Sequence, residues 1–245
     1  MGVNISVTNM KQTVNIILSN LEDWRGKYIC VSNVHTTVMA SEDEKYRNIQ
    51  NSAVMALPDG APLSRYCHEK GLHEAGRVTG PDLMKTLLEI NATNLLNSPK
   101  RDNNIRHFFY GSTDETLVKL KQTILERYPQ AEICGMISPP FRELDDEEDT
   151  KIINKINDVN PDIVWVGLGA PKQEIWMYNH QAKINALMIG VGAAFDYESG
   201  NIKRAPQWMQ NLSLEWLFRL IQEPSRLFKR YFTTNAKYLL WKMRH

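Results

Sequence analysis

The fold is indicated most clearly by the stretch Val164-Trp165-Val166-Gly167-Leu168-Gly169-Ala170-Pro171-Lys172-Gln173-Glu174-Ile175. An apolar, β-prone run ends at two glycines, and a Pro-Lys-Gln-Glu segment follows that should open a helix. This order predicts a strand, a tight turn and a helix N-terminus, where exposed backbone N–H groups favour an anion. The glycines let the backbone approach a ligand, and Pro171 suits the first helical turn, where its missing N–H would have no partner. We expect the polar side chains of residues 172–174 to face whatever the turn holds.

The glycine spacing of this stretch is G-x-G-x-P, which differs from the G-x-G-x-x-G fingerprint of dinucleotide sites. The acidic residue that usually follows that fingerprint about 20 positions later has no counterpart in the usual context. A turn that needs glycine for its backbone geometry alone is therefore an alternative to a ligand-binding turn.

Predicted strands alternate with predicted helices along most of the chain. Apolar runs predict strands at residues 28–32, 53–57, 107–110, 131–137, 162–167 and 186–191. Helical patterns occupy residues 36–51, 61–69, 83–96, 112–128 (opened by a Ser112-x-x-Glu115 capping box) and a segment begun by the acidic run 145–149, and the polar segment 97–104 is a predicted surface loop. Such alternation predicts an α/β fold with a mostly parallel sheet and helices on both faces.

Ligands of open α/β sheets bind beyond the carboxyl ends of the strands. The glycines and polar residues that stand at those predicted ends are Asn33, Asp59-Gly60, Thr79-Gly80, Gly111-Ser112, 167–174 and Gly192-x-x-Phe195-Asp196. Thr79 is also a candidate N-cap for the helix that follows it. We expect these residues to gather around one crevice.

Asp59 is the strongest catalytic candidate because it directly follows an apolar run and precedes a glycine. A carboxylate held at the mouth of the crevice can act as a general base, although Asp-Gly pairs also form turns for backbone reasons alone. His35 is a second candidate base because imidazole titrates near neutrality, but a lone His after a strand is more often a structural hydrogen-bonding residue. Asp196 is a further carboxylate candidate, with the alternative role of capping the next turn.

Composition narrows the function classes. A chain of 245 residues is long enough for one large α/β domain or for such a domain with an appendage. The three scattered cysteines have neither disulfide nor metal spacing, which favours a reducing compartment. No Asp-x-Asp, metal-ligand, Walker or G-x-S-x-G motif occurs, so we expect no metal and no cofactor. We see no signal peptide and no apolar run long enough to span a membrane.

The last 45 residues differ in character from the rest. Residues 201–245 hold nine Lys or Arg and two Glu, so they carry +7 and residues 1–200 carry −6 of the formal net charge of +1. The segment also holds eight aromatic residues, and helical patterns cover 208–222 and 225–243. We therefore divide the chain into an α/β domain (1–200), which holds the candidate catalytic residues, and a basic, aromatic helical appendage (201–245). The appendage is suited to a membrane surface, or it packs on the domain with a solvated basic face.

With these features together, the chain resembles the WecG/TagA/CpsF family of bacterial glycosyltransferases over nearly its whole length. The matching motifs are Asn33 with its following helix, Leu57-Pro58-Asp59-Gly60, Arg77-Val78-Thr79-Gly80-x-Asp82-Leu83-Met84, Tyr110-Gly111, Val166-Gly167-Leu168-Gly169-Ala170-Pro171-Lys172-Gln173-Glu174, Gly190-Val191-Gly192-x-x-Phe195-Asp196, Arg204-Ala205-Pro206-x-Trp208, Leu214-Glu215-Trp216, Arg219-Leu220, Glu223-Pro224-x-Arg226 and Arg230-Tyr231. One departure is Val31, where many relatives have a Thr. Ser32, Thr36 and Thr37 are the hydroxyls that are candidates to replace it.

The resemblance implies a Rossmann-like body and an inverting enzyme. Such an enzyme moves a hexose or N-acetylhexosamine, for example N-acetylmannosamine, from a UDP-sugar to a polyprenyl-diphosphate-linked sugar. The product belongs to a cell-envelope polysaccharide such as teichoic acid, capsule or exopolysaccharide. The resemblance further implies no required metal, no nucleic-acid partner and a cytoplasmic, peripheral location on the inner face of the bacterial membrane. A homo-oligomer is also compatible with the apolar face of the appendage.

The resemblance also assigns roles to residues. Asp59 matches the general base and Gln173 a donor-site residue. The appendage arginines that match phosphate-binding positions are Arg204, Arg219, Arg226 and Arg230. The further donor-binding candidates are Asn33, Gly60, Thr79, Gly80, Gly111, Gly167, Gly169, Ala170, Pro171, Lys172, Glu174, Gly192, Phe195 and Asp196. Without a metal motif, backbone N–H groups and arginines are the available groups that can stabilise a departing diphosphate.

Two other functions remain open at the level of sequence. An NAD-binding oxidoreductase agrees with the α/β alternation and the glycine turns, but the glycine spacing and the basic tail disfavour it. A non-catalytic lipid-binding module agrees with the basic, aromatic appendage alone. Liposome binding is expected of both the transferase and the lipid-binding module, whereas UDP release is expected only of the transferase.

Overall fold

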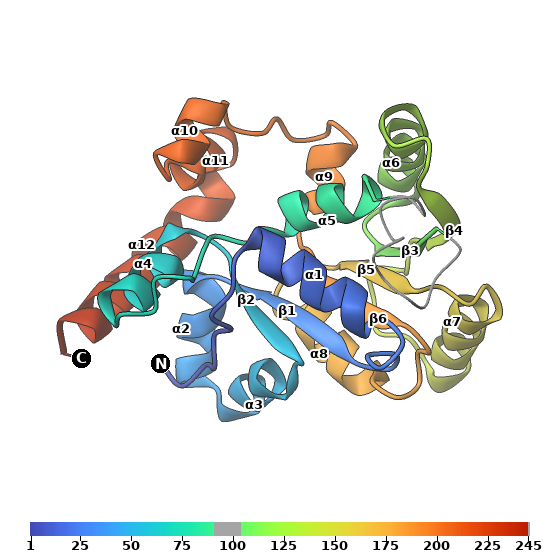
Figure 1. The fold of residues 1–245 in the computed structure, drawn as a ribbon, viewed down its shortest axis with the longest axis horizontal. Coiled ribbons are helices and arrows are strands. Elements are labelled where there is room, and N and C mark those ends of the chain that lie inside the picture. Colours follow the sequence, from blue (N-terminus) through green and yellow to red (C-terminus); the bar gives the residue numbers. More distant parts are fainter. Residues whose placement is uncertain (91–103, 245) are drawn as a thin grey trace.

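In the computed structural model, residues 1–90 and 104–244 are described. Six parallel strands in this part of the chain form one sheet in the order β2-β1-β6-β5-β3-β4 (Figure 1). The strands are β1 (Tyr28–Ser32), β2 (Met55–Pro58), β3 (Arg106–Gly111), β4 (Glu132–Ile137), β5 (Ile163–Gly167) and β6 (Leu187–Gly190). The predicted parallel α/β class is confirmed, and each strand lies within about two residues of its predicted position.

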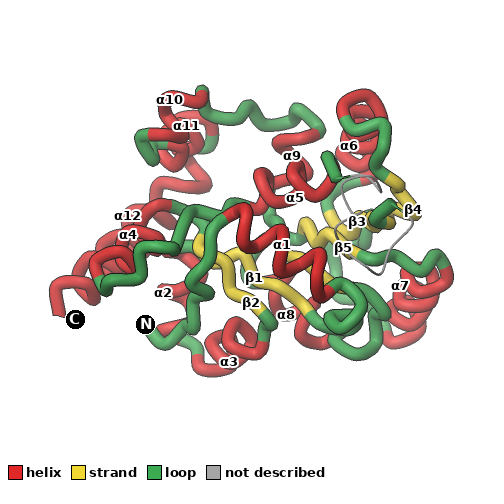
Figure 2. The backbone as a smooth tube through the Cα atoms, in the orientation of Figure 1, coloured by secondary structure: helices red, strands yellow, loops and turns green. Residues whose placement is uncertain are grey.

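Helices cover both faces of the sheet (Figures 1 and 2). One face carries α1 (Met10–Asn20), α5 (Gly80–Leu88), α6 (Asp114–Arg127) and α9 (Ala194–Glu198), and the other carries α3 (Glu44–Ser52), α7 (Asp146–Asp158) and α8 (Lys172–His180). Strand side chains alternate between two apolar cores, as the two-residue period requires. In β5, Trp165 packs with Phe195 in one core, whereas Val164 and Val166 pack with Met177 in the other.

A third group of helices lies beside the first two strands. α2 (Val34–Glu42) and α4 (Ala61–Glu69) pack with α12 (Pro224–Arg244), which follows α10 (Gln207–Asn211) and α11 (Glu215–Gln222). The Tyr238 hydroxyl donates to the Pro62 carbonyl at 3.0 Å, and the Lys242 ammonium pairs with Glu69 at 2.6 Å. The appendage is thus helical and docked on the body, while its status as a separate domain stays a prediction. Among the described helices, none is long and apolar enough to cross a membrane.

Two predicted helices are each divided in the structure. The segment 36–51 breaks at Asp43, whose extended backbone ends α2 and whose carboxylate accepts a hydrogen bond from the Tyr46 N–H (3.1 Å) to begin α3. The segment 208–222 breaks between α10 and α11, where Ser213 adopts a positive φ of 61°. Hydrophobic periodicity extends across both breaks and therefore does not reveal them.

The remaining differences concern helix ends. The helix predicted to reach residue 96 ends at Leu88, so Glu89 and Ile90 were wrongly predicted as helical. Residues 91–96 of that prediction, with most of the predicted loop at 97–104, lie outside the described residues. The predicted capping residue Ser112 has φ +60°, and Thr113 caps α6 instead by accepting from the Thr116 N–H at 3.2 Å. The acidic start of α7 and the Thr79 cap of α5 are confirmed.

The first helix, α1, was absent from the sequence prediction. Its signal was nevertheless present, since Asn9 and Gln12 form a reciprocal capping box. Val14, Ile17 and Leu21 follow at helical spacing and are buried. The short helix α9 was also missed, because five residues are too few for a periodic pattern.

Candidate active site

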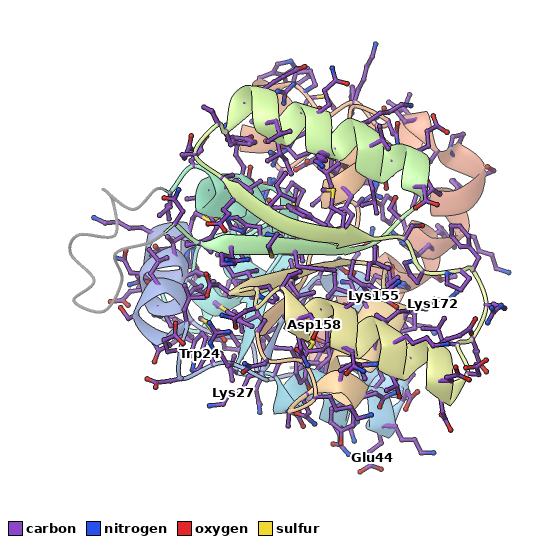
Figure 3. The ribbon with its side chains drawn as sticks, turned by 90° about the vertical axis from the view of Figure 1, so that its right-hand side faces the viewer. Trp24, Lys27, Glu44, Lys155, Asp158 and Lys172 are labelled. Carbon is purple, nitrogen blue, oxygen red and sulfur yellow. The ribbon has the colours of Figure 1, made fainter. Side chains whose placement is uncertain are left out.

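A cavity of about 1160 Å³ lies at the carboxyl ends of the strands, between the sheet and the C-terminal helices. Figure 3 shows Lys172 on the side toward which the front strands point, whereas Trp24 and Lys27 lie toward the opposite side. Fifteen of the predicted site residues line the cavity: Asn33, Asp59, Gly60, Thr79, Gly80, Gly167, Gly169, Ala170, Pro171, Lys172, Gln173, Gly192, Asp196, Arg219 and Arg230. The structure therefore brings together residues that are nearly two hundred positions apart in the chain.

Asp59 stands directly after β2, in the wall of the cavity. Its backbone N–H donates to the Ser32 carbonyl at 2.8 Å, which holds it against the end of β1. Burial raises the pKa of its carboxyl from the ordinary 3.8 to about 6, against the lowering effects of the Arg77 guanidinium and of a hydrogen bond from the Asn33 side chain. A partly buried carboxylate with a pKa near 6 is suited to accept a proton at neutral pH.

Asn33 and Thr79 have structural duties as well as positions at the cavity. Asn33 Oδ1 accepts from the Thr36 N–H (3.2 Å), and Thr36 Oγ1 accepts from the Asn33 N–H (2.9 Å), so the pair caps α2. This leaves the amide nitrogen of Asn33 to contact Asp59. Thr79 Oγ1 accepts from the Asp82 N–H and donates to the Asp82 carboxylate at 2.7 Å, so it caps α5.

The three hydroxyls considered as replacements for the family Thr at Val31 differ in location. Thr36 lines the cavity, as does Val31 itself. The Ser32 hydroxyl is buried and donates to the Gln50 side chain, and the Thr37 hydroxyl is buried and donates to the carbonyl of Asn33. Thr36 is thus the one of the three that stands at the cavity, but it is buried as well, and its hydroxyl already accepts from the Asn33 N–H and donates to the Asn33 carbonyl.

The turn between β5 and α8 has the expected geometry. Gly169 adopts a φ of +77° with open space where a Cβ would stand, and Pro171 is the N-cap residue of α8. A Cβ on Gly167 would come within 2.7 Å of the Phe195 ring, and one on Gly111 would lie 2.6 Å from the Gly167 carbonyl carbon. Gly111 and Phe195 thus pack against Gly167 in the turn and do not line the cavity.

The polar residues that open α8 divide in their orientation. Lys172 and Gln173 line the cavity, as predicted. Glu174 is instead buried completely beneath the first turn of the helix, at 0% exposure. The expectation that the polar side chains of 172–174 all face the ligand site therefore holds for the first two and not for the third.

The four predicted arginines also separate. Arg219 of α11 and Arg230 of α12 line the cavity. Arg204 stands outside its lining and pairs with Asp82 at 2.6 Å and with Glu215 at 3.4 Å. The side chain of Arg226 lies outside the described residues.

Arg77 and Glu215 are cavity residues that the prediction did not assign to the site. They form an ion pair beside Asp59 and join the body to α11. His35, which ranked below Asp59, also lines the cavity near Arg230, and burial lowers its pKa to about 4. Its Nδ1 atom has no hydrogen-bond partner among the described residues. Arg77 and Glu215 each belong to a motif that carries the family resemblance, but nothing in the sequence around either residue indicates that the two form an ion pair.

The whole chain, residues 1–245, matches the model of the glycosyl transferase WecG/TagA/CpsF family. The chain belongs to this family. A family relative from Bacillus subtilis (strain 168), named N-acetylglucosaminyldiphosphoundecaprenol N-acetyl-beta-D-mannosaminyltransferase, is 32% identical over 202 residues, or 82% of this chain and 73% of that protein. A protein of the same name from Bacillus spizizenii (strain ATCC 23059 / NRRL B-14472 / W23) is 28% identical to this chain, and the match covers 92% of this chain and 82% of that protein. Another from Staphylococcus aureus (strain MW2) is 27% identical, and the match covers 93% of this chain and 85% of that protein.

Family membership makes the protein a glycosyltransferase. This favours the enzyme hypothesis over the NAD-binding oxidoreductase and over the non-catalytic lipid-binding module. In the described residues, no group of three or more His, Cys, Asp or Glu side chains is placed to hold a metal ion. The individual roles of the cavity residues remain proposals.

Proposed function

We propose that the protein transfers a hexose or N-acetylhexosamine from a UDP-sugar to a polyprenyl-diphosphate-linked sugar, with inversion at the anomeric carbon. N-acetylmannosamine is the first candidate sugar and an N-acetylglucosaminyl diphosphoundecaprenol the first candidate acceptor, because the relatives carry those words in their names. The observation that carries the proposal is the position of Asp59, which shares one cavity with the N-terminus of α8 and with two arginines of the appendage.

In the proposed reaction, Asp59 removes the proton of the acceptor hydroxyl as that oxygen attacks the anomeric carbon of the donor. The new glycosidic bond forms while the bond from the anomeric carbon to the UDP oxygen breaks, so UDP leaves with the bonding electrons. One direct displacement inverts the configuration at that carbon. The N-terminus of α8 and the guanidinium groups of Arg219 and Arg230 then stabilise the charge that develops on the diphosphate.

A lipid-linked acceptor requires contact with a membrane, and the C-terminal helices are suited to it. Their large exposed apolar side chains are Trp208, Leu212, Trp216, Ile221, Phe228, Phe232, Leu239, Leu240 and Met243. One face of α12 packs on the body. Phe228, Phe232, Leu240 and Met243 of the same helix are exposed and stand outside the cavity lining, and they form its outward face. We propose that this outward face binds the inner surface of the bacterial membrane. Self-association through the same face stays an alternative use of it.

The direct experiment is a transfer assay with purified protein, a panel of UDP-sugars and an undecaprenyl- or shorter polyprenyl-diphosphate N-acetylglucosamine. We expect UDP release that needs both the donor and the acceptor, with one preferred sugar, and a disaccharide-lipid product of inverted configuration. UDP release that is independent of acceptor, or a product that retains the donor's configuration, would contradict the proposal.

A further inference from the structure

Glu174 is a buried carboxyl that the proposed mechanism does not use. It follows Gln173, which lines the cavity, yet its own side chain is 0% exposed. The Gln173 side-chain nitrogen donates to Glu174 Oε1 at 2.8 Å, while the second carboxyl oxygen has no hydrogen-bond partner among the described residues. Burying a carboxyl is costly unless hydrogen bonds compensate, so its presence here calls for a role.

A chain of buried hydrogen bonds leads to this carboxyl from the opposite side. The Tyr46 hydroxyl hydrogen-bonds to Glu174, and the Gln50 side-chain nitrogen donates to the Tyr46 oxygen at 2.9 Å. The Ser32 hydroxyl donates to the Gln50 carbonyl oxygen at 2.6 Å. Every donor in this chain points toward Glu174, and Ser32 is the last residue of β1, directly before Asn33.

This arrangement determines which end of the Gln173 amide faces which neighbour. Burial raises the pKa of the Glu174 carboxyl, and its Oε1 atom accepts from the Gln173 amide nitrogen. The Gly192 N–H can only donate, so it requires the amide oxygen on its own side and leaves the amide nitrogen for Glu174. Its nitrogen faces Glu174, and its oxygen accepts from the Gly192 N–H at 3.0 Å. The amide nitrogen has two hydrogens, and one therefore remains for a ligand in the cavity.

Glycine at position 190 supports the same placement. A Cβ on Gly190 would lie 3.1 Å from the Gln173 side-chain nitrogen and 2.8 Å from the Met177 methyl carbon. Any larger residue at this last position of β6 would push the amide away from its two partners. The end of β6 is thus shaped to receive the Gln173 side chain.

We propose that Glu174 is a positioning residue, which holds the Gln173 amide so that its remaining N–H meets an acceptor oxygen of the donor substrate. The inference rests on the proposed function, because it takes the cavity ligand to be a UDP-sugar. It explains why an acidic residue follows the glutamine even though it never touches the cavity. It also predicts that Glu174 affects donor affinity and leaves acceptor affinity unchanged.

The sharpest test is an exchange variant, Gln173→Glu combined with Glu174→Gln, assayed in the full-length chain. The buried pair is kept, since Gln at 174 can donate to Glu at 173, and Glu at 173 can still accept from the Gly192 N–H. The cavity, however, now meets an acceptor-only carboxylate. We expect a melting temperature close to that of the wild type, a donor KM raised more than tenfold, and an unchanged acceptor KM.

The single variant Glu174→Gln, which differs by one atom, provides an independent measurement. It replaces a carboxyl group that accepts from the Gln173 amide with a carboxamide that can also donate, so the amide is held less firmly. We expect donor KM and the Kd for UDP to rise about 3- to 10-fold, the effect of one hydrogen bond, with kcat nearly unchanged. Asp158→Asn on the exposed side of α7 (Figure 3) is the matched acid-to-amide control and should equal wild type.

The outcomes separate the two proposals. Wild-type donor KM in a folded exchange variant, or in Glu174→Gln if the exchange variant does not fold, would overturn the positioning role while the transferase function stands. A wild-type protein that neither binds UDP nor turns over any UDP-sugar would overturn both.

Discussion

At the scale of single residues, Asp59 has the position and the pKa that a general base requires. Its pKa of about 6 predicts that kcat/KM rises with pH through about 6, as the carboxyl loses its proton, and then levels off. Asp59→Ala should lower turnover by about 10²- to 10⁴-fold and remove this acidic limb. The measurement is the pH profile of UDP release, with Asp158→Asn as control. An unchanged profile in Asp59→Ala would assign the base to another group, such as His35.

The same pKa carries a prediction for stability. The folded protein holds the Asp59 proton more tightly than the ordinary pKa of 3.8 implies. The free energy of unfolding therefore falls as pH rises from about 4 to about 6, and it stays at the lower value above pH ~6. Asp59→Asn cannot ionise and should therefore melt higher than wild type at pH 7.5, by about 2–4 °C for each kcal/mol gained. The difference should vanish near pH ~3.5. A lower melting temperature at pH 7.5 would mean that the attraction of Arg77 outweighs burial.

Local patterns predicted some site residues and could not predict others. Asp59 follows β2 directly and Gly169 stands two residues after β5, so the end of an apolar run was sufficient to place them at the cavity. The sequence predicted that Glu174 faces the ligand like Lys172 and Gln173. Its position on α8, however, directs its side chain into the interior. The Arg77–Glu215 pair joins segments more than 130 residues apart, and no local signal specifies such a partner.

At the scale of elements, the break between α2 and α3 gives a prediction that periodicity alone could not supply. Asp43 caps α3 by accepting from the Tyr46 N–H at 3.1 Å, and Tyr46 reaches Glu174. Asp43→Ala should cost about 1 kcal/mol in the free energy of unfolding, the usual value of an N-cap. Urea denaturation measures the change, and Asp23→Ala, at an exposed site outside any helix start, should stay within about 0.5 kcal/mol of wild type. Equal stability of the two variants would contradict the cap.

At the scale of the whole molecule, the alternation of strands and helices was enough to predict a parallel sheet with two covered faces. The strand order β2-β1-β6-β5-β3-β4 was not predictable, because it depends on pairs such as β1 with β6 that lie far apart in the chain. The position of α11 and α12 over the cavity was not predictable for the same reason, because it depends on contacts between segments that lie far apart in the chain. The composition of residues 201–245 indicated an appendage, but only the folded structure shows that Arg219, Arg230 and Lys242 of this segment line the cavity.

The outward face of α12 gives the last prediction. Phe228 and Phe232 lie one turn apart with stacked rings and are 64% and 71% exposed, so neither supports the core. Transfer of each ring from water into a bilayer interface should contribute about 1.5–3 kcal/mol. Phe228→Ser combined with Phe232→Ser should therefore weaken binding to vesicles of anionic lipid at least about 100-fold, since each ~1.4 kcal/mol is a factor of ten. Val118→Ser on α6, at 69% exposure, is the matched control and should bind like wild type in the same vesicle sedimentation assay. If the double variant sediments with vesicles as wild type does but changes the protein's self-association, α12 is a surface between copies of the chain instead.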